Sequence, residues 1–182
     1  MQSGTVALRK AYPHEQEELF LLVTQDEEWT KFNGPYFPYE TPTRESFEKE
    51  EFVGFLKCER GRLITVDDKP VGSIGYYWEC KETRWLEIGI LIYDSTYWNK
   101  GIGRQAMELW ITHLFNTQEI ERVGATTWSG NPGMMACAIK TGMKLEARLR
   151  KVRYYNGSYY DSVKYGVLRE EWKKLHAKVS LS

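Results

Sequence analysis

The stretch Trp98-Asn99-Lys100-Gly101-Ile102-Gly103-Arg104 stands between an apolar strand pattern and an amphipathic helix pattern. Its two glycines, one residue apart, let the backbone approach a ligand closely and turn several N–H groups in the same direction. The helix that follows adds the positive end of its dipole, and Lys100 and Arg104 add full charges. These features are typical of a site that holds a pyrophosphate group.

Three interpretations of this stretch are open on its residues alone. In the first, the glycines form only the turn between a strand and a helix. In the second, Gly101-x-Gly103-x-x-Ala106 is a dinucleotide-binding motif, which should follow its strand directly within a βαβ unit. The strand pattern ends near Tyr93, about seven residues earlier, and the preceding strands have hairpin signals, so this motif is disfavoured. The third is a loop for the diphosphate of coenzyme A.

Predicted helices and strands follow one another along the rest of the chain. Hydrophobic periodicity and turn residues predict helices that begin at Pro13 and Thr43, and further helices over 101–117, 132–141 and 169–178. Strands are predicted over 6–11, 63–66, 71–77, 85–93, 123–128, 145–155 and 159–168. This order predicts an α/β fold in which helices cover the faces of a mixed sheet.

The composition is that of one folded domain over residues 1–182. Hydrophobic residues make up 42% of the chain and charged residues 27%, which argues against a disordered chain. Lys plus Arg and Asp plus Glu both number 25, so binding to DNA mainly through phosphates is not expected. No apolar run reaches the roughly 20 residues of a membrane span, and the first residues lack the apolar core of a signal peptide. We therefore expect a cytoplasmic protein without a membrane partner.

Cysteine and histidine spacing gives no sign of a disulfide framework or a metal site. Cys58, Cys80 and Cys137 are odd in number and widely spaced, so free thiols in a reducing compartment are expected. The 3 histidines lack the spacing of metal ligands, and we expect no metal.

Three blocks of the sequence resemble the GNAT acetyltransferase superfamily, and within it the branch of ribosomal-protein N-terminal acetylases. The family loop Q/R-x-x-G-x-G/A is matched by Trp98-x-x-Gly101-x-Gly103, with Trp98 in place of Gln or Arg. The block N-x-x-S-x-x-V-L-x-K-x-G-F is matched over 131–143, with Asn131, Lys140 and Gly142 in register and methionine in place of Ser and Phe. The third block is the hairpin 155–161 with the ending 168–172, which resembles L-x-x-E-W. The resemblance covers roughly residues 6–172.

The resemblance implies an acyl-CoA N-acyltransferase-like fold with a mixed, mostly antiparallel sheet of about seven strands and helices on both faces. In such a fold the fourth strand, here 85–93, and the fifth, here 123–128, splay apart, and acetyl-CoA enters between them as cosubstrate. Backbone groups of the fourth strand would bind the pantetheine arm, the glycine loop the diphosphate, and an asparagine amide the coenzyme. The implied cosubstrate-binding residues are Ile90, Leu91, Ile92, Trp98, Asn99, Lys100, Gly101, Ile102, Gly103, Arg104 and Asn131.

The expected reaction is direct attack of an amine on a thioester. An alkyl amine is mostly protonated at neutral pH, so the site needs a base. The resemblance implies Glu87, which lies eleven residues before Trp98 on the fourth strand; alternatively, Glu87 lies on a solvated strand face. The resemblance also implies that a backbone N–H near Leu91 stabilises the developing oxyanion. The general acid stays open, because Ala138 stands where some relatives carry a tyrosine. Either the thiolate leaves unassisted, or another phenol serves as the acid; the candidates are Tyr93, Tyr97, Tyr154 and Tyr160.

The predicted function is that of an N-acetyltransferase for a primary amine. The acceptor could be a protein N-terminus, an amino acid, a polyamine or an aminoglycoside. The alternative is a non-catalytic sensor that binds acyl-CoA with the same fold. A homodimer is compatible with the resemblance. An aromatic segment, 29–39, either covers the core or lines the acceptor site; it contains Trp29, Phe32, Tyr36, Phe37 and Tyr39.

Overall fold

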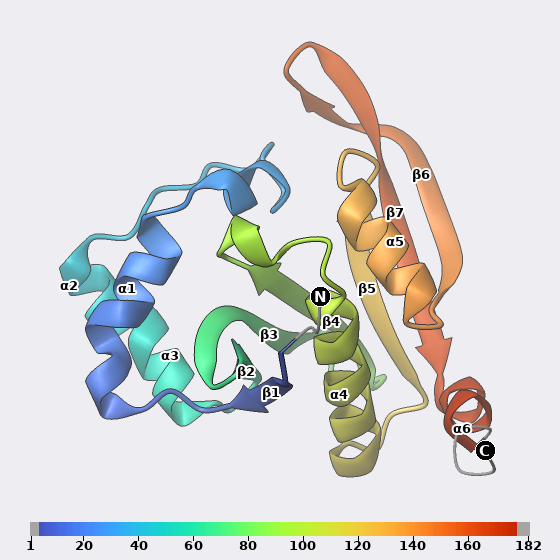
Figure 1. Cartoon of the computed structure of the whole chain (residues 1–182). Coiled ribbons are helices and arrows are strands. Elements are labelled where there is room, and N and C mark those ends of the chain that lie inside the picture. Colours follow the sequence, from blue (N-terminus) through green and yellow to red (C-terminus); the bar gives the residue numbers. More distant parts are fainter. Residues whose placement is uncertain (1–3, 178–182) are drawn as a thin grey trace. The chain divides into compact units, whose positions relative to one another are not determined.

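The computed structural model describes residues 4–177. Within these residues, one sheet contains seven strands in the order β1-β2-β3-β4-β5-β7-β6 (Figure 1). The strands are β1 (Val6–Arg9), β2 (Gly61–Val66), β3 (Lys69–Cys80), β4 (Trp85–Ile92), β5 (Arg122–Trp128), β6 (Lys144–Tyr155) and β7 (Ser158–Leu168). The pair β4–β5 is parallel, and the pairs β1–β2, β2–β3, β5–β7 and β6–β7 are antiparallel. The predicted mixed, mostly antiparallel sheet is confirmed.

Helices connect these strands much as the sequence predicts. They are α1 (Gln16–Thr24), α2 (Arg44–Lys49), α3 (Glu51–Lys57), α4 (Ile102–Thr117), α5 (Pro132–Lys140) and α6 (Arg169–Ala177). Short 3-10 helices are η1 (Pro13–Glu15), η2 (Glu28–Lys31) and η3 (Ser95–Tyr97). No helix within residues 4–177 is long and apolar enough to cross a bilayer.

Two compact units make up the described chain. Unit 1 contains the residues up to Gly75 together with Ile90–Ala106, and unit 2 contains Tyr76–Gly89 together with the residues from Met107 onward. Strands β3 and β4 and helix α4 each continue from one unit into the other. The single domain over residues 1–182 stays a prediction.

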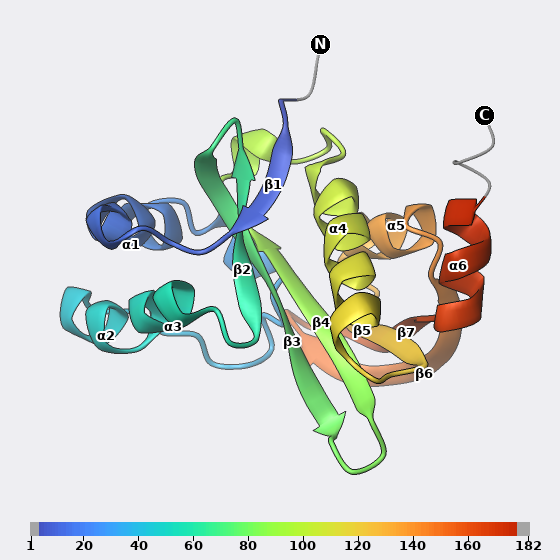
Figure 2. The same ribbon diagram turned by 90° about the horizontal axis from the view of Figure 1, so that it is seen from below.

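Unit 1 is built around an aromatic core beneath α1, α2 and α3, which group on one side of β1 and β2 (Figure 2). The sequence predicts one helix after Thr43, but the structure breaks it at Glu50. Phe47 and Phe52 explain the break, because residues five apart point about 140° apart on a continuous helix. The break allows both rings to be buried in the same core.

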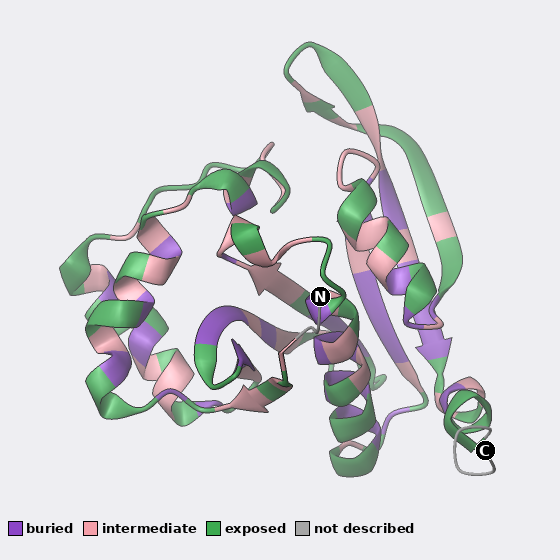
Figure 3. Ribbon diagram, in the orientation of Figure 1, coloured by how far each residue is buried: buried purple, intermediate pink, exposed green. Residues whose placement is uncertain are grey.

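Unit 2 places its helices on one face of β5, β7 and β6 (Figures 1 and 2). Strand alternation turns Val123, Ala125 and Val163 toward these helices, and all three are buried. Asn156 and Gly157 have φ values of 46° and 75°, as the predicted tight turn between β6 and β7 requires. Strand β6 is largely exposed, whereas β7 is exposed next to the turn and mostly buried from Ser162 onward (Figure 3).

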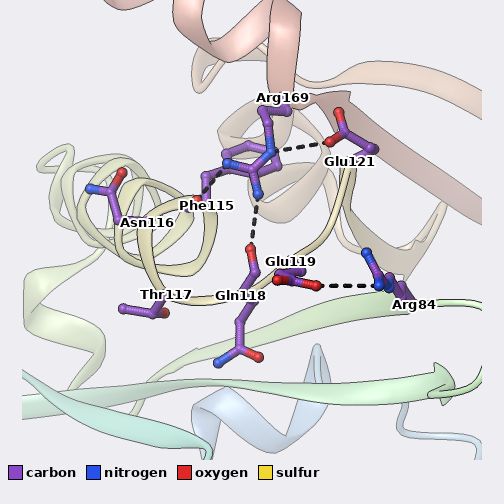
Figure 4. Close-up of a pocket in the computed structure, with 8 residues that line it drawn as sticks. All are labelled: Arg84, Phe115, Asn116, Thr117, Gln118, Glu119, Glu121 and Arg169. Atoms are coloured by element: carbon purple, nitrogen blue, oxygen red, sulfur yellow. Dashed lines mark hydrogen bonds and ion pairs between the residues drawn. The ribbon is translucent and has the colours of Figure 1, made fainter.

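An open pocket of about 480 Å³ lies at the C-terminal end of α4 (Figure 4). Its lining residues are Arg84, Phe115, Asn116, Thr117, Gln118, Glu119, Glu121 and Arg169. The Arg169 guanidinium donates to the carbonyls of Phe115, Gln118 and Ile120 at 2.5, 2.9 and 2.8 Å. The Phe115 carbonyl lies in the last turn of α4, where helix carbonyls lack partners, and the other two lie just after the helix, so Arg169 caps α4 and holds the segment that follows it. The charged groups of this pocket pair with one another, which makes it a structural feature of the helix end.

The C-terminal helix α6 is fastened to α4 by a second side chain. The indole N–H of Trp172 donates to the Thr112 hydroxyl at 3.1 Å. Glu171 accepts from the Leu168 backbone N–H at 3.0 Å and so caps the start of α6. The L-x-x-E-W ending therefore holds the last helix in place.

Candidate active site

The glycine loop leads directly into α4 in unit 1. Gly101 has φ +80°, and a Cβ at this position would meet nothing within 4 Å. Asn99 also has a positive φ, of 58°. The first turn of a helix has N–H groups without intrahelical partners, and the first bond here is donated by Gln105 to the Gly101 carbonyl. The loop is open to a ligand, contains a left-handed glycine and an exposed Lys100, and leads into a sixteen-residue helix. These features are suited to binding a diphosphate at the helix N-terminus.

Trp98 connects this loop to the end of β4. Its indole N–H donates to the Ile92 carbonyl at 3.0 Å. The ring of Phe32 packs edge-on against Trp98 with centroids 5.5 Å apart. The tryptophan that replaces Gln or Arg of the family loop therefore has a structural role within unit 1.

Asp26 ties the acidic start of the aromatic segment to the residues before the loop. Its Oδ2 accepts from the Ser95 backbone N–H at 3.0 Å. Hydrogen bonds from Ser95 and from the Glu28 backbone hold the pKa of Asp26 below its usual range. An ionised Asp26 thus anchors η3, which leads into Trp98.

The aromatic segment divides into buried and exposed rings. Trp29 is buried and packs edge-on against Tyr93 and Tyr39, with both centroid distances at 5.2 Å. Phe37 is 58% exposed. Burial raises the pKa of Tyr39, and the nearby carboxylates of Glu27 and Glu51 raise it further. Trp29 therefore belongs to the core, and the acceptor-site role of the segment stays a prediction.

Asn131 lies in unit 2 and caps α5. Its side-chain oxygen accepts from the Met134 backbone N–H at 2.9 Å, with Pro132 in the first turn. Asparagine at the N-cap is a favoured residue because it satisfies an unpaired helix N–H. The block around Asn131 therefore has a helix-start role, and its predicted contact with a coenzyme stays a prediction.

Glu87 is completely buried on β4 in unit 2, at 0% exposure. Its Oε2 accepts from the Thr126 hydroxyl at 2.6 Å, and its Oε1 accepts from the Trp85 indole N–H at 3.3 Å. Nη2 of Arg122 lies 3.5 Å from Oε1. The alternative of a glutamate on a solvated face is therefore wrong. The predicted catalytic role of Glu87 stays a prediction.

Arg122 joins Glu87 to a second carboxylate. Its Nε lies 3.0 Å from both carboxylate oxygens of Glu146 on β6. Burial lowers the pKa of Arg122, but the hydrogen bonds and charge of Glu146, and then the charge of Glu87, raise it overall. A charged Arg122 thus lies between two carboxylates.

The four candidate acids differ in their surroundings. Tyr93 is buried, and its hydroxyl lies 2.8 Å from that of Ser73. Burial raises the pKa of Tyr93 to about 12, against the lowering effect of Ser73. Tyr154 is 61% exposed, Tyr160 packs on Trp128, and Tyr97 faces the Lys100 ammonium at 5.4 Å.

Sequence reasoning did not find a further tyrosine near Glu87. Burial, and then the charges of Glu87 and Glu79, raise the pKa of Tyr77 to about 12. It also did not find Arg122, Thr126 and Glu146. Glycines within predicted strands, here Gly124 and Gly166, indicate a close approach by another group but do not identify that group.

The structure places the predicted residues in both units. Unit 1 brings together Ile90–Ile92 and the loop 98–104, whereas Glu87 and Asn131 belong to unit 2. In the part of the chain that the structure describes, no group of three His, Cys, Asp or Glu side chains is placed to hold a metal ion. The three cysteines are free thiols; Cys58 is buried and the other two are half-buried.

A mixed sheet whose fourth strand leads through a glycine loop into a helix defines the acyl-CoA N-acyltransferase-like class of folds. Residues 5–144 match the family model described as an acetyltransferase (GNAT) domain. The chain therefore belongs to the GNAT acetyltransferase family.

Relatives of similar length support this assignment. The uncharacterized N-acetyltransferase YoaA of Bacillus subtilis is 22% identical over 178 residues, which cover 93% of this chain and 96% of YoaA. The putative ribosomal N-acetyltransferase YdaF of the same organism is 25% identical over 174 residues, which cover 92% of this chain and 93% of YdaF. The ribosomal-protein-serine acetyltransferase of Escherichia coli is 23% identical over 162 residues, covering 87% and 90%.

Solved structures share the fold. A GNAT-family acetyltransferase from Bacillus anthracis has a TM-score of 0.73 and 21% identity, covering 93% of this chain and 98% of its own. Spermidine N-acetyltransferase from Vibrio cholerae, solved with CoA and spermine, has a TM-score of 0.72 and 16% identity, covering 92% and 97%.

Proposed function

We propose that this protein transfers the acetyl group of acetyl-CoA to a primary amine. The glycine loop at the start of α4 is the observation that carries the proposal, because it offers an open approach to a left-handed glycine at a helix N-terminus. The names of the relatives agree with this activity. The spermidine enzyme with the same fold was solved with CoA, which supports CoA chemistry as the starting hypothesis.

The loop residues would hold the cosubstrate through its diphosphate. The N–H groups of Ile102 and Gly103 belong to the first turn of α4, and Lys100 and Arg104 add positive charge beside them. Backbone groups of Ile90–Ile92 would hold the pantetheine arm, and Asn131 is assigned a contact with the coenzyme on the resemblance alone. When bound, acetyl-CoA would supply a thioester whose acyl carbon forms the new C–N bond with the amine as its C–S bond breaks, so that CoA leaves as a thiolate and is protonated to the free thiol.

Glu87 would remove the proton that the amine nitrogen must lose when it forms its new bond. Each carboxylate oxygen has two lone-pair directions, so Oε1 and Oε2 can each accept a proton or a water beyond the bonds from Trp85 and Thr126. We assign stabilisation of the developing negative charge to a backbone N–H near Leu91. The acceptor is a primary amine on a protein, an amino acid, a polyamine or an aminoglycoside.

The first test is calorimetric titration of the full chain with acetyl-CoA, and with NADH as a parallel ligand. We expect micromolar binding of acetyl-CoA alone. Gly103→Val should weaken this binding at least tenfold, since a branched side chain would occupy the space of the diphosphate. Gly54→Val is the control, because a Cβ at Gly54 meets nothing within 4 Å and Gly54 lies in α3. Equal weakening by both variants, or binding of NADH instead, would contradict the proposal.

The second test measures release of free thiol with a panel of spermidine, kanamycin and a peptide with a free α-amine. Glu87→Gln should lose most of the rate at neutral pH and keep its affinity for acetyl-CoA. Glu82→Gln, in the exposed turn after β3, should keep both. An unchanged rate in Glu87→Gln removes it as the base. Acetyl-CoA binding without thiol release from any amine would favour the sensor alternative.

A further inference from the structure

A chain of three charged side chains crosses four strands of unit 2. Glu87 on β4 contacts Arg122 on β5, and Arg122 contacts Glu146 on β6, while β7 lies between β5 and β6 in the sheet. Arg122 also donates to the Tyr165 carbonyl of β7, at 3.4 Å. The buried carboxylate on β4 is thereby connected to an outer strand of the same sheet.

Two glycines provide the space in which this chain lies. Gly124 on β5 pairs with both Glu87 on β4 and Gly166 on β7. A Cβ at Gly124 would lie 2.4 Å from Nη1 of Arg122 and 2.7 Å from Oε1 of Glu87, and one at Gly166 would lie 2.1 Å from Oε1 of Glu146. Glycine weakens a strand interior unless a close approach requires it. The paired glycines thus form a trough for the carboxylates and the guanidinium.

A hydroxyl completes the surroundings of Glu87. Thr126 lies on β5 two residues after Gly124, so alternation places its side chain on the same face of the sheet. Its bond to Oε2 is the shortest that Glu87 accepts, at 2.6 Å. Burying a carboxylate is costly unless its charge is compensated and its oxygens are hydrogen-bonded. Arg122 meets the first need and Thr126 the second.

We propose that Arg122 and Thr126 are positioning residues for Glu87, with Glu146 and the two-glycine trough holding Arg122 in place. The proposal rests on the proposed function of Glu87 as the base. Arg122 keeps a negative charge stable at a site without exposure to solvent, and Thr126 fixes the orientation of the carboxylate. Neither side chain needs to touch the amine.

Other charged and titratable groups also face this site from the neighbouring strands. Tyr77 on β3 experiences the charges of Glu87 and Glu79. The Lys164 ammonium on β7 lies 5.4 Å from the centre of the Trp85 ring, on the strand that carries Glu87. Arg122 is the cation that pairs directly with Glu87, so its removal should dominate any change in the titration of this site.

The test combines pH profiles of kcat/KM with acceptor-free NMR. Arg122→Met should move the acidic limb of the profile to higher pH, since an opposite charge nearby favours an ionised carboxylate. Arg122→Lys should move it less. Arg148→Met is the control, because Arg148 pairs with Asp161 on the β6–β7 hairpin. Affinity for acetyl-CoA should stay within twofold in all three variants.

The role of Thr126 is tested by removing its hydroxyl while keeping the size and branching of the side chain. Thr126→Val should lower kcat about tenfold, the lower range expected for a hydrogen bond to a charged group, and Thr126→Ser should restore it. Thr127→Val, the buried neighbour on the other face of β5, is the control. If Thr126→Val keeps the wild-type kcat, the positioning role of Thr126 is wrong.

NMR of protein with ¹³C-labelled glutamate carboxyls reports Glu87 without any acceptor, and Glu87→Gln identifies its signal. If the Glu87 signal titrates at the same pH in the wild type and in Arg122→Met, the proposed role of Arg122 is wrong. If Glu87→Gln keeps full activity, the base assignment fails, whatever the NMR result. If Glu87→Gln is inactive while Arg122→Met and Thr126→Val leave the pH profile and kcat unchanged, the proposed function stands and the positioning proposal fails.

Discussion

Arg169 offers a sharp test of how α4 is stabilised. Its guanidinium donates to one carbonyl in the last turn of the helix and to two in the segment just after it, contacts Glu121 at 3.5 Å and lies over the Phe115 ring at 5.0 Å. Arg169→Met keeps much of the side-chain length and apolar volume but removes every one of these donors. The glycine loop begins the same helix, so this change tests the opposite end of α4.

The expected loss follows from the three bonds. A hydrogen bond from a charged donor contributes about 1.5–3 kcal/mol, and bonds made by one group are not additive. The Arg169 side chain is 20% exposed beside an open pocket, so water can replace part of the lost bonding. We therefore expect the free energy of unfolding to fall by about 3 kcal/mol, equivalent to a decrease in Tm of about 6–12 °C for a chain of this length.

Urea unfolding followed by tryptophan fluorescence measures this loss, and calorimetry gives Tm. Arg169→Lys should recover about a third of the loss, since one ammonium cannot reach all three carbonyls in the geometry of the guanidinium. Arg148→Met should lose less than about 1 kcal/mol, because Arg148 is an exposed partner of Asp161. A loss below about 1 kcal/mol in Arg169→Met would refute the capping argument.

Three further predictions concern smaller features. Asn131→Ala should lower the free energy of unfolding by about 1 kcal/mol through loss of the α5 cap, and Asn131→Asp should retain most of it, in urea unfolding. Burial raises the pKa of Glu15, but bonds from Arg9 and a backbone N–H outweigh burial and lower it. Glu15 therefore stabilises the fold at pH values above its pKa in the unfolded chain, and this contribution is lost as the pH falls through its pKa in the folded protein. Because Glu15→Gln lacks this group, its Tm should decrease less steeply than that of the wild type below about pH 4. Trp98→Phe keeps the ring but loses the bond to Ile92, and should weaken acetyl-CoA binding several-fold in calorimetry while Tm changes little.

Features with local signals were predictable from the sequence. The tight turn of the 155–161 hairpin depends on neighbouring residues, and the positive φ values of Asn156 and Gly157 confirm it. The glycine loop was placed correctly between β4 and α4 for the same reason. The break at Glu50 was missed because it depends on the shared burial of Phe47 and Phe52, which helical periodicity does not record.

The surroundings of Glu87 could not be predicted, because its partners come from distant parts of the chain. Thr126, which forms its shortest hydrogen bond, is 39 residues away in sequence. Alternation along β4 left both faces possible, and only the pairing with β5 decides which neighbours Glu87 meets. Glu146 reaches this site only through Arg122, so no motif of fixed spacing can describe the group.

The paired glycines of β5 and β7 have a consequence for the evolution of related chains. A side chain at Gly124 or Gly166 would occupy the positions of the guanidinium or the outer carboxylate. A homologue that acquires alanine at either position must therefore also lose Arg122 or Glu146, or move them elsewhere. Across an alignment, these four positions should change together, and descendants that retain only part of the group should be rare.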